Sequence, residues 1–281
     1  MLYFTSEKKY KKVLSILLTV TILCSNAAIL THAAELSPEQ YLKSIGVPDE
    51  YLANISEYEI NDIYNDYKDK PGVSFNSMDT YYMEDENPGG ELQTRGTISS
   101  SSLKITIATF NHKLIDKSDN TTTLVMVDVR VSYQWLKAPK IKNTDSITLD
   151  WNHEKFYYKE SSFEAKSLYD QIKYSGSNVK DVVYSTTSKN PKKVIAGSIL
   201  WDYPFAVWDE ITNYHGYAKF TLYPYNTIYQ KNAVVDAFYY NYVHSTNPLP
   251  ISISYSIKGF SIELNAGLLS DSMGGSYEYR F

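Results

Sequence analysis

The sequence predicts a mainly β protein, an antiparallel β-sandwich preceded by a short N-terminal helical segment. From Leu103 to the end of the chain, apolar and polar residues alternate in roughly ten short runs without a helical run between them. Tyrosine, which favours strands, supplies 27 of the 281 residues. Strands with one apolar and one polar face pack apolar face to apolar face, which favours a sandwich over a barrel.

The first 33 residues predict a secretory signal peptide. A lysine-rich start is followed by an apolar run over 13–23 and by Thr31-His32-Ala33, which places small residues before a cut after Ala33. An apolar run of this length is too short to cross a bilayer, which takes about 20 residues. We therefore expect a secreted, extracellular protein that begins near Ala34 and keeps no transmembrane anchor after cleavage.

The composition excludes several kinds of chemistry. Cys24 is the only cysteine and lies in the leader, so the mature chain has no disulfide and no thiolate. The whole chain carries a net charge of −5, and losing a lysine-rich leader makes it more acidic, so nucleic acid is not an expected partner. No two histidines lie at the spacing of metal ligands, so we expect no metal. The sequence also contains no nucleophile elbow, phosphate loop or dinucleotide fingerprint, so we expect no cofactor.

The N-terminal part of the mature chain carries helix signals. Ser37 with Gln40, and Ser56 with Glu59, have the spacing of capping boxes ahead of apolar residues at helical intervals. An acidic stretch and then a serine-rich stretch follow, which is typical of a linker. The expected signal peptide, helical segment, linker and all-β sandwich domain cover residues 1–33, 34–70, 71–102 and 103–281.

The alternating pattern is clearest over residues 125–135. Valine, tyrosine and tryptophan occupy one face, which we expect to be buried. The residues between them, among them Asp128, Arg130 and Ser132, occupy the other face, which we expect to meet water. This run therefore predicts a long strand at the surface of the sandwich.

Other strands are predicted with their partners. Residues 251–264 alternate on both sides of Gly259 and predict a hairpin, whereas residues 233–243 are apolar on both faces, as in a central strand. Residues 182–184 and 194–201 predict two further strands that we expect to pair with each other.

One aromatic run is a candidate binding site. A proline within it favours an edge or a loop. Exposed rings of Trp201, Tyr203 and Trp208 could stack on a sugar, and the carboxylates of Asp202 and Asp209 could accept hydrogen bonds from its hydroxyl groups. The alternative is that this run fills the end of the sandwich as part of the core. No catalytic residue is predicted.

A plan of the chain can also be compared with known proteins. After the lysine-rich leader comes a helical segment that contains Tyr41-Leu42-Lys43-Ser44-Ile45-Gly46-Val47-Pro48, and a tyrosine-rich β domain follows. This layout resembles exported proteins of unknown function from Gram-positive bacteria. The resemblance concerns the order of the segments and implies no functional residue.

These observations favour a secreted, non-catalytic binding or surface-associated protein over an enzyme. Its expected partner is a carbohydrate, a cell-wall component or another surface protein. One alternative is a membrane-active β protein, because the chain ends in alternating aromatic residues. The other is a secreted hydrolase that acts on polysaccharide through a pair of carboxylates. The candidate carboxylates for that pair are Glu154, Asp202, Asp209, Glu210 and Asp236.

Overall fold

A computed structural model shows how most of the chain from residue 36 onward is arranged. Among the described residues, no helix combines the length and the apolar character needed to cross a membrane. The predicted signal peptide lies outside the described residues. The described residues are 36–82, 102–116, 118, 121–137, 139, 144–175, 178–203, 211–226, 228–229, 235–245, 253–265 and 270–281.

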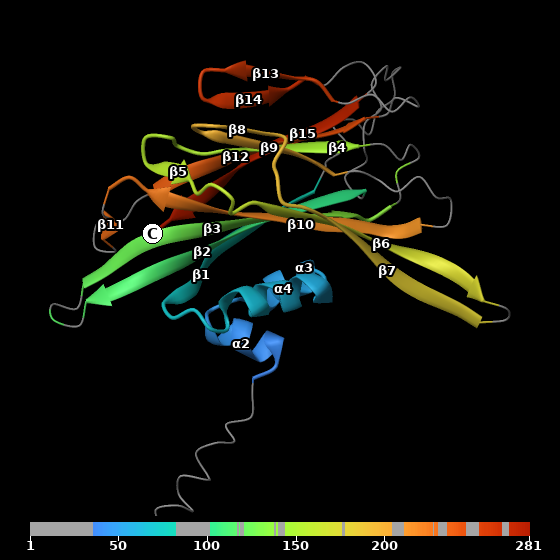
Figure 1. Ribbon diagram of the computed structural model, residues 1–281, viewed down its shortest axis with the longest axis horizontal. Coiled ribbons are helices and arrows are strands. Elements are labelled where there is room, and N and C mark those ends of the chain that lie inside the picture. Colours follow the sequence, from blue (N-terminus) through green and yellow to red (C-terminus); the bar gives the residue numbers. More distant parts are fainter. Residues whose placement is uncertain are drawn as a thin grey trace, which may run out of the picture.

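The described part of the chain has four layers (Figure 1). Helices α2 (Pro38–Ser44), α3 (Asp49–Asn54) and α4 (Glu57–Tyr67) lie on one face of an eight-stranded sheet. A five-stranded sheet packs on its other face, and a two-stranded sheet covers the far side of the five-stranded sheet. The expected antiparallel β-sandwich with a short helical segment is confirmed.

The eight-stranded sheet is antiparallel throughout and carries the helices. Its strand order is β1-β2-β3-β10-β6-β7, while β11 pairs with β3 and β5 pairs with β10. The strands are β1 (Val73–Tyr82), β2 (Leu103–Asp116), β3 (Thr121–Trp135), β5 (Phe156–Tyr158), β6 (Glu164–Ser175), β7 (Asn178–Ser188), β10 (Ile211–Pro224) and β11 (Ile228–Tyr229).

The five-stranded sheet has the order β15-β12-β4-β9-β8, so β12 lies inside the sheet with a strand on each side, as its sequence predicted. The expected hairpin is also confirmed, with Gly259 at a φ of +61° in its turn. The strands of these two sheets are β4 (Asp145–Asp150), β8 (Lys193–Ile195), β9 (Ser198–Tyr203), β12 (Val235–Ser245), β13 (Tyr255–Lys258), β14 (Ser261–Leu264) and β15 (Ser270–Arg280).

The main core fills the space between the two large sheets. Val127, Val129 and Val131 of β3 point into it and are fully buried, as the alternating pattern predicted. Val125 differs and is exposed, because the register between β2 and β3 shifts there: Met126 pairs with His112 whereas Leu124 pairs with Lys113. Val125 is the extra residue of a β-bulge, which reverses the alternation locally.

The opposite face of β3, expected to meet water, is covered by the helices. Leu42 of α2 and Ile63 of α4 form a second core with Phe110 of β2. The Arg130 side chain, on the same outer face, is 0% exposed. The helices and the β domain, which we expected as separate segments, therefore pack against each other in one interface.

Two further expectations differ from the structure. The linker predicted over 71–102 contains β1, which pairs with β2 from Val73 to Tyr82 and supplies Val73 to the second core. The expected pairing of 182–184 with 194–201 is wrong. β7 pairs with β6, and β8 pairs with β9, so the chain passes from one sheet to the other between β7 and β8.

Candidate functional site

Helix α4 sets the geometry of the outer face of the eight-stranded sheet. Its N-cap Ser56 accepts a hydrogen bond from the backbone N–H of Glu59, as the capping pattern predicted. The Glu59 carboxyl, however, turns toward the sheet, where the Ser132 hydroxyl donates to it at 2.7 Å. One residue therefore serves the helix cap with its backbone and the helix–sheet interface with its side chain.

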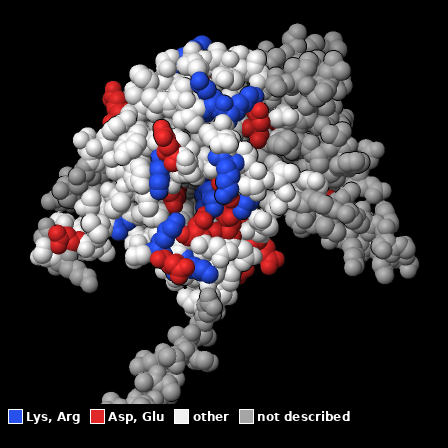
Figure 2. All heavy atoms as spheres, in the orientation of Figure 1, with Lys and Arg blue, Asp and Glu red and all other residues white. Residues whose placement is uncertain are grey.

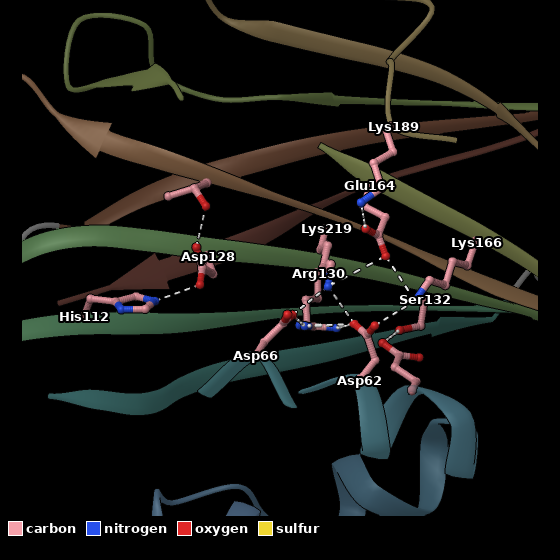
Figure 3. A network of polar contacts seen from close by, with 12 residues as sticks. Asp62, Asp66, His112, Asp128, Arg130, Ser132, Glu164, Lys166, Lys189 and Lys219 are labelled. Atoms are coloured by element: carbon pink, nitrogen blue, oxygen red, sulfur yellow. Dashed lines mark hydrogen bonds and ion pairs between the residues drawn. The ribbon is translucent and has the colours of Figure 1, made fainter. Parts of the chain in front are cut away.

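An ion network joins the middle of α4 to the sheet (Figure 3). Arg130 of β3 contacts Asp62 at 3.3 Å and also pairs with Asp66. Lys166 of β6 and Lys219 of β10 each place their ammonium 2.8 Å from an Asp62 oxygen. Burial alone would raise the pKa of Asp62, but the cations, Arg130 first among them, hold it well below its usual range.

Charged side chains gather in the middle of this view of the surface, around α4 (Figure 2). Acidic atoms lie at the centre, with basic atoms beside them. Two cavities flank the network, one at each end of the helix.

The helix-end pocket, a cavity of about 200 Å³, lies beside the C-terminal end of α4. One wall is fixed by Asp128, which accepts hydrogen bonds from His112 at 2.7 Å and from the Thr221 hydroxyl at 2.6 Å. Two lysines on its rim, Lys70 and Lys159, form no ion pair with any described carboxylate. Its lining residues are Asp66, Tyr67, Lys70, Asp128, Arg130, Lys159, Ser162, Lys219, Phe220 and Thr221.

A cluster of three aromatic rings, the tyrosine patch, adjoins this pocket; Tyr157 and Tyr225 are exposed and Tyr223 is half-buried. Tyr157 lies opposite Tyr223 in the β5–β10 pairing, with ring centroids 5.6 Å apart, and the Tyr157 and Tyr225 rings are 4.8 Å apart. Tyr157 is 40% exposed and Tyr225 is 57% exposed. The Lys159 ammonium, which lines the helix-end pocket, is 5.5 Å from the centroid of the Tyr223 ring.

The pocket and the patch belong to one continuous surface. Alternate residues of a strand share a face, so Lys219, Thr221 and Tyr223 of β10 follow one another on the outer face. Phe220 and Leu222, between them, are buried in the sandwich core. The ion network, the helix-end pocket and the tyrosine patch therefore follow in this order along β10.

The helix-start pocket, a cavity of about 300 Å³, lies where α3 gives way to α4. Gly216 of β10 forms part of its wall, and an added Cβ would lie 2.3 Å from the Lys166 carbonyl oxygen. The side chains of Glu59, Lys104 and His215 meet this cavity from α4, β2 and β10. Its lining residues are 53–57, Glu59, Lys104, Thr106, Ser132, Tyr133, Gln134, Asn213, His215 and Gly216.

The residues proposed from the sequence as an aromatic platform lie elsewhere. Trp201 and Tyr203 are each 1% exposed in the sandwich core, so the expectation that their rings meet solvent is wrong. They alternate with Asp202 on β9, and their side chains point inward between the two large sheets. Trp208 and Asp209 lie outside the described residues.

The carboxylates considered for a hydrolase are placed in separate contacts. Asp202 accepts a hydrogen bond from Ser146 and pairs with Lys192 at 2.9 Å. Asp236 pairs with Lys155 at 3.5 Å, and Glu154 is exposed in a turn. Asp209 and Glu210 lie outside the described residues.

Sequence reasoning predicted neither pocket. Arg130 was assigned to the face that meets water, because the alternating pattern cannot show that helices cover that face. Glu59 gave a misleading signal, since a capping-box glutamate is expected to accept from the backbone N–H of the N-cap residue, whereas this one accepts from Ser132. The tyrosine patch gave none, because Tyr157 and Tyr225 meet only through the pairing of β5 with β10.

Comparison with known proteins adds no family to this description. No protein-family model matches the chain, and no curated protein matches its sequence. The fold and the outer face define the chain as a β-sandwich with a helix-covered sheet and two polar pockets, and the functional argument rests on that geometry.

Proposed function

We propose that this chain is a secreted binding protein for acidic carbohydrate, which it holds on the tyrosine patch and the helix-end pocket. The observation that carries the proposal is the position of exposed, mutually packed tyrosine rings beside lysines that no described carboxylate neutralises. The predicted signal peptide supports export. The role as a non-catalytic binding protein agrees with the expectation from the sequence.

The tyrosine patch suits the apolar side of a sugar. One face of a pyranose ring presents C–H groups, which pack on aromatic rings, while its hydroxyl groups point outward to polar partners. Tyrosine provides an apolar ring and a polar tip in one side chain and loses little conformational freedom on binding. Because Tyr157 and Tyr225 already contact each other, part of the entropy of ordering them is lost before the ligand arrives.

The charge distribution selects an anionic ligand. Arg130 and Lys219 are neutralised by α4, but Lys70 and Lys159 face aromatic rings instead, 5.7 Å from the Tyr67 centroid and 5.5 Å from the Tyr223 centroid. A cation over a ring keeps most of its charge available. A carboxylate on a sugar that rests on the tyrosine patch would meet Lys159 at the rim of the pocket.

Titration calorimetry on the mature protein tests the proposal with two oligosaccharides of equal length, one built of uronic acids and one neutral. We expect the acidic oligosaccharide to bind more tightly and to lose affinity as salt is added, because exposed charges are screened. Lys159→Met should remove this preference. The matched control is Lys258→Met on the hairpin, at the opposite side of the layered structure. Equal affinity for both oligosaccharides would contradict the charge argument, and no binding of either would contradict the function.

A further inference from the structure

The helix-start pocket contains a buried cation with only a neutral partner. The Lys104 residue is 8% exposed, and its ammonium donates to the Asn54 Oδ1 at 3.3 Å. The Asn54 amide nitrogen donates to the Glu50 carbonyl at 2.9 Å, which turns its oxygen toward the lysine. An ammonium has three N–H donors, so a single amide oxygen leaves its charge largely uncompensated. Burial accordingly lowers the pKa of Lys104.

The same cavity contains a buried carboxyl that does not pair with this lysine. Glu59 is 2% exposed and accepts from Ser132, but it forms no ion pair with Lys104, although both residues line the pocket. Burial raises the pKa of Glu59 to about 7, so near neutral pH much of it is protonated and able to donate a hydrogen bond. The charged and titratable groups that influence it or line the same pocket are Tyr51, Glu57, Asp62, Lys104, Arg130, Tyr133, Tyr203, His215, Tyr217 and Lys219.

The sheet supplies a polar wall in register with the lysine. Lys104 of β2 lies opposite Gln134 of β3, and Gln134 lies opposite His215 of β10. Residues directly opposite each other in antiparallel strands share a face, so the three side chains form one row. The His215 Nδ1 donates to the Asn213 carbonyl at 2.8 Å, which leaves Nε2 of the neutral ring as an acceptor.

We propose that the helix-start pocket binds a small carboxylate anion, of monosaccharide size or less, whose carboxylate contacts both the Lys104 ammonium and the Glu59 carboxyl. Gln134 and His215 supply hydrogen bonds to the hydroxyl or amino groups of the same molecule. The ligand carboxylate compensates the positive charge of Lys104, whose hydrogen-bond partner within the protein is the neutral Asn54 amide. This site is separate from the tyrosine patch and lies at the other end of α4, so it does not depend on the function proposed above.

Calorimetric titration of the mature protein with glucuronate and with glucose tests the assignment, because the two sugars differ in a carboxylate. We expect glucuronate to bind and glucose to bind at least about tenfold more weakly, as expected for the loss of a charged hydrogen bond. Lys104→Met keeps the length and most of the apolar stem and should abolish the preference. Lys258→Met, on the hairpin and away from both pockets, is the matched control and should leave it unchanged.

The pH profile separates a role in the site from a merely structural role. Raising the pH from 6 to 8 ionises Glu59 and places a second negative charge beside the ligand, so glucuronate affinity should fall by about tenfold. Glu59→Gln keeps a donor without a charge and should bind glucuronate equally at both pH values.

Several results would overturn the assignment. These are equal binding of glucuronate and glucose, the same glucuronate affinity in Lys104→Met as in the unaltered protein, or loss of binding in Lys258→Met alone. A tenfold effect of pH on glucuronate affinity that persists in Glu59→Gln would show that Glu59 does not contact the ligand. If Lys104→Met does not fold, as judged by its far-ultraviolet circular dichroism, the pH profiles of the unaltered protein and Glu59→Gln decide the matter.

Discussion

The guanidinium of Arg130, on β3, meets the carboxylate of Asp62, on α4, at 3.3 Å, with the arginine side chain entirely buried. This contact joins the helical layer to the eight-stranded sheet, and it stands between the two pockets. The helices are therefore part of the walls of both candidate sites.

Replacing Arg130 should destabilise the whole molecule. Arg130→Met removes the cation and leaves two carboxylates at the interface with only the lysines to neutralise them. Breaking a buried ion pair in this way costs about 3–5 kcal/mol. Urea denaturation should show this loss in the free energy of unfolding. Lys258→Met, which breaks an exposed pair on the hairpin, should leave the unfolding midpoint unchanged. Equal midpoints for the two variants would show that the helices are not held by this network.

Stability should fall as the pH rises from about 4.5 to about 7, through the titration of Glu59. Its folded pKa is raised to about 7 from a usual value of 4.5, so in this range the folded state holds a proton that the unfolded state has released. The stabilisation is complete below the unfolded pKa and is lost as the pH rises through the folded pKa. The total is about 3 kcal/mol, at about 1.4 kcal/mol for each pH unit.

The measurement compares unfolding free energies of the unaltered protein and of Glu59→Gln across this pH range. The difference between them isolates Glu59 from other carboxyls whose pKa burial raises, such as Asp145 and Asp150. We expect the difference to shrink or change sign steadily with rising pH. A constant difference would show that Glu59 is not buried in solution.

Trp201 should behave as a core residue. Its ring packs against Phe163 and Tyr203 at centroid distances of 5.9 and 6.3 Å between the two sheets. Trp201→Ala should therefore lower the free energy of unfolding by about 3–5 kcal/mol, as other large-to-small changes in a core do. An unaltered melting temperature would restore the surface role first expected of this residue.

Gly216 should tolerate no side chain. A Cβ there would lie 2.3 Å from the Lys166 carbonyl oxygen and 2.5 Å from the Tyr133 ring. Gly216→Ala should cost about 1–3 kcal/mol through overpacking. The control is Gly274→Ala, where the nearest atom, the Tyr240 carbonyl oxygen, is 3.3 Å away and a small shift suffices. The measurement is the thermal unfolding midpoint of both variants. A lower midpoint for Gly274→Ala than for Gly216→Ala would contradict the described geometry.

Much of the sandwich could be predicted because burial between two sheets repeats every second residue, as in Val127, Val129 and Val131. The helix caps at Ser37 and Ser56 were equally readable, since capping depends on neighbours in sequence. What covers the outer face could not be read, because the partners of Arg130 lie more than 60 residues away in the chain. The pockets follow from that covering, so neither could be predicted.

The sequence likewise could not show which aromatic residues are exposed. The sequence places many aromatic side chains on strands, but strand pairing decides which ones meet at the surface. Trp201 and Tyr203 were conspicuous in sequence and are buried, whereas Tyr157 and Tyr225 were inconspicuous and are exposed together.

The most direct test of the proposed function compares two tyrosines of equal exposure. Tyr225 is 57% exposed in the tyrosine patch, and Tyr239 is 58% exposed on the five-stranded sheet. Tyr225→Ala and Tyr239→Ala are titrated calorimetrically with the same uronic acid oligosaccharide. The account predicts that Tyr225→Ala weakens binding by about fivefold or more, since a stacked aromatic ring contributes about 1 kcal/mol or more, while Tyr239→Ala leaves the affinity unchanged. Equal affinities for the two variants would contradict the account.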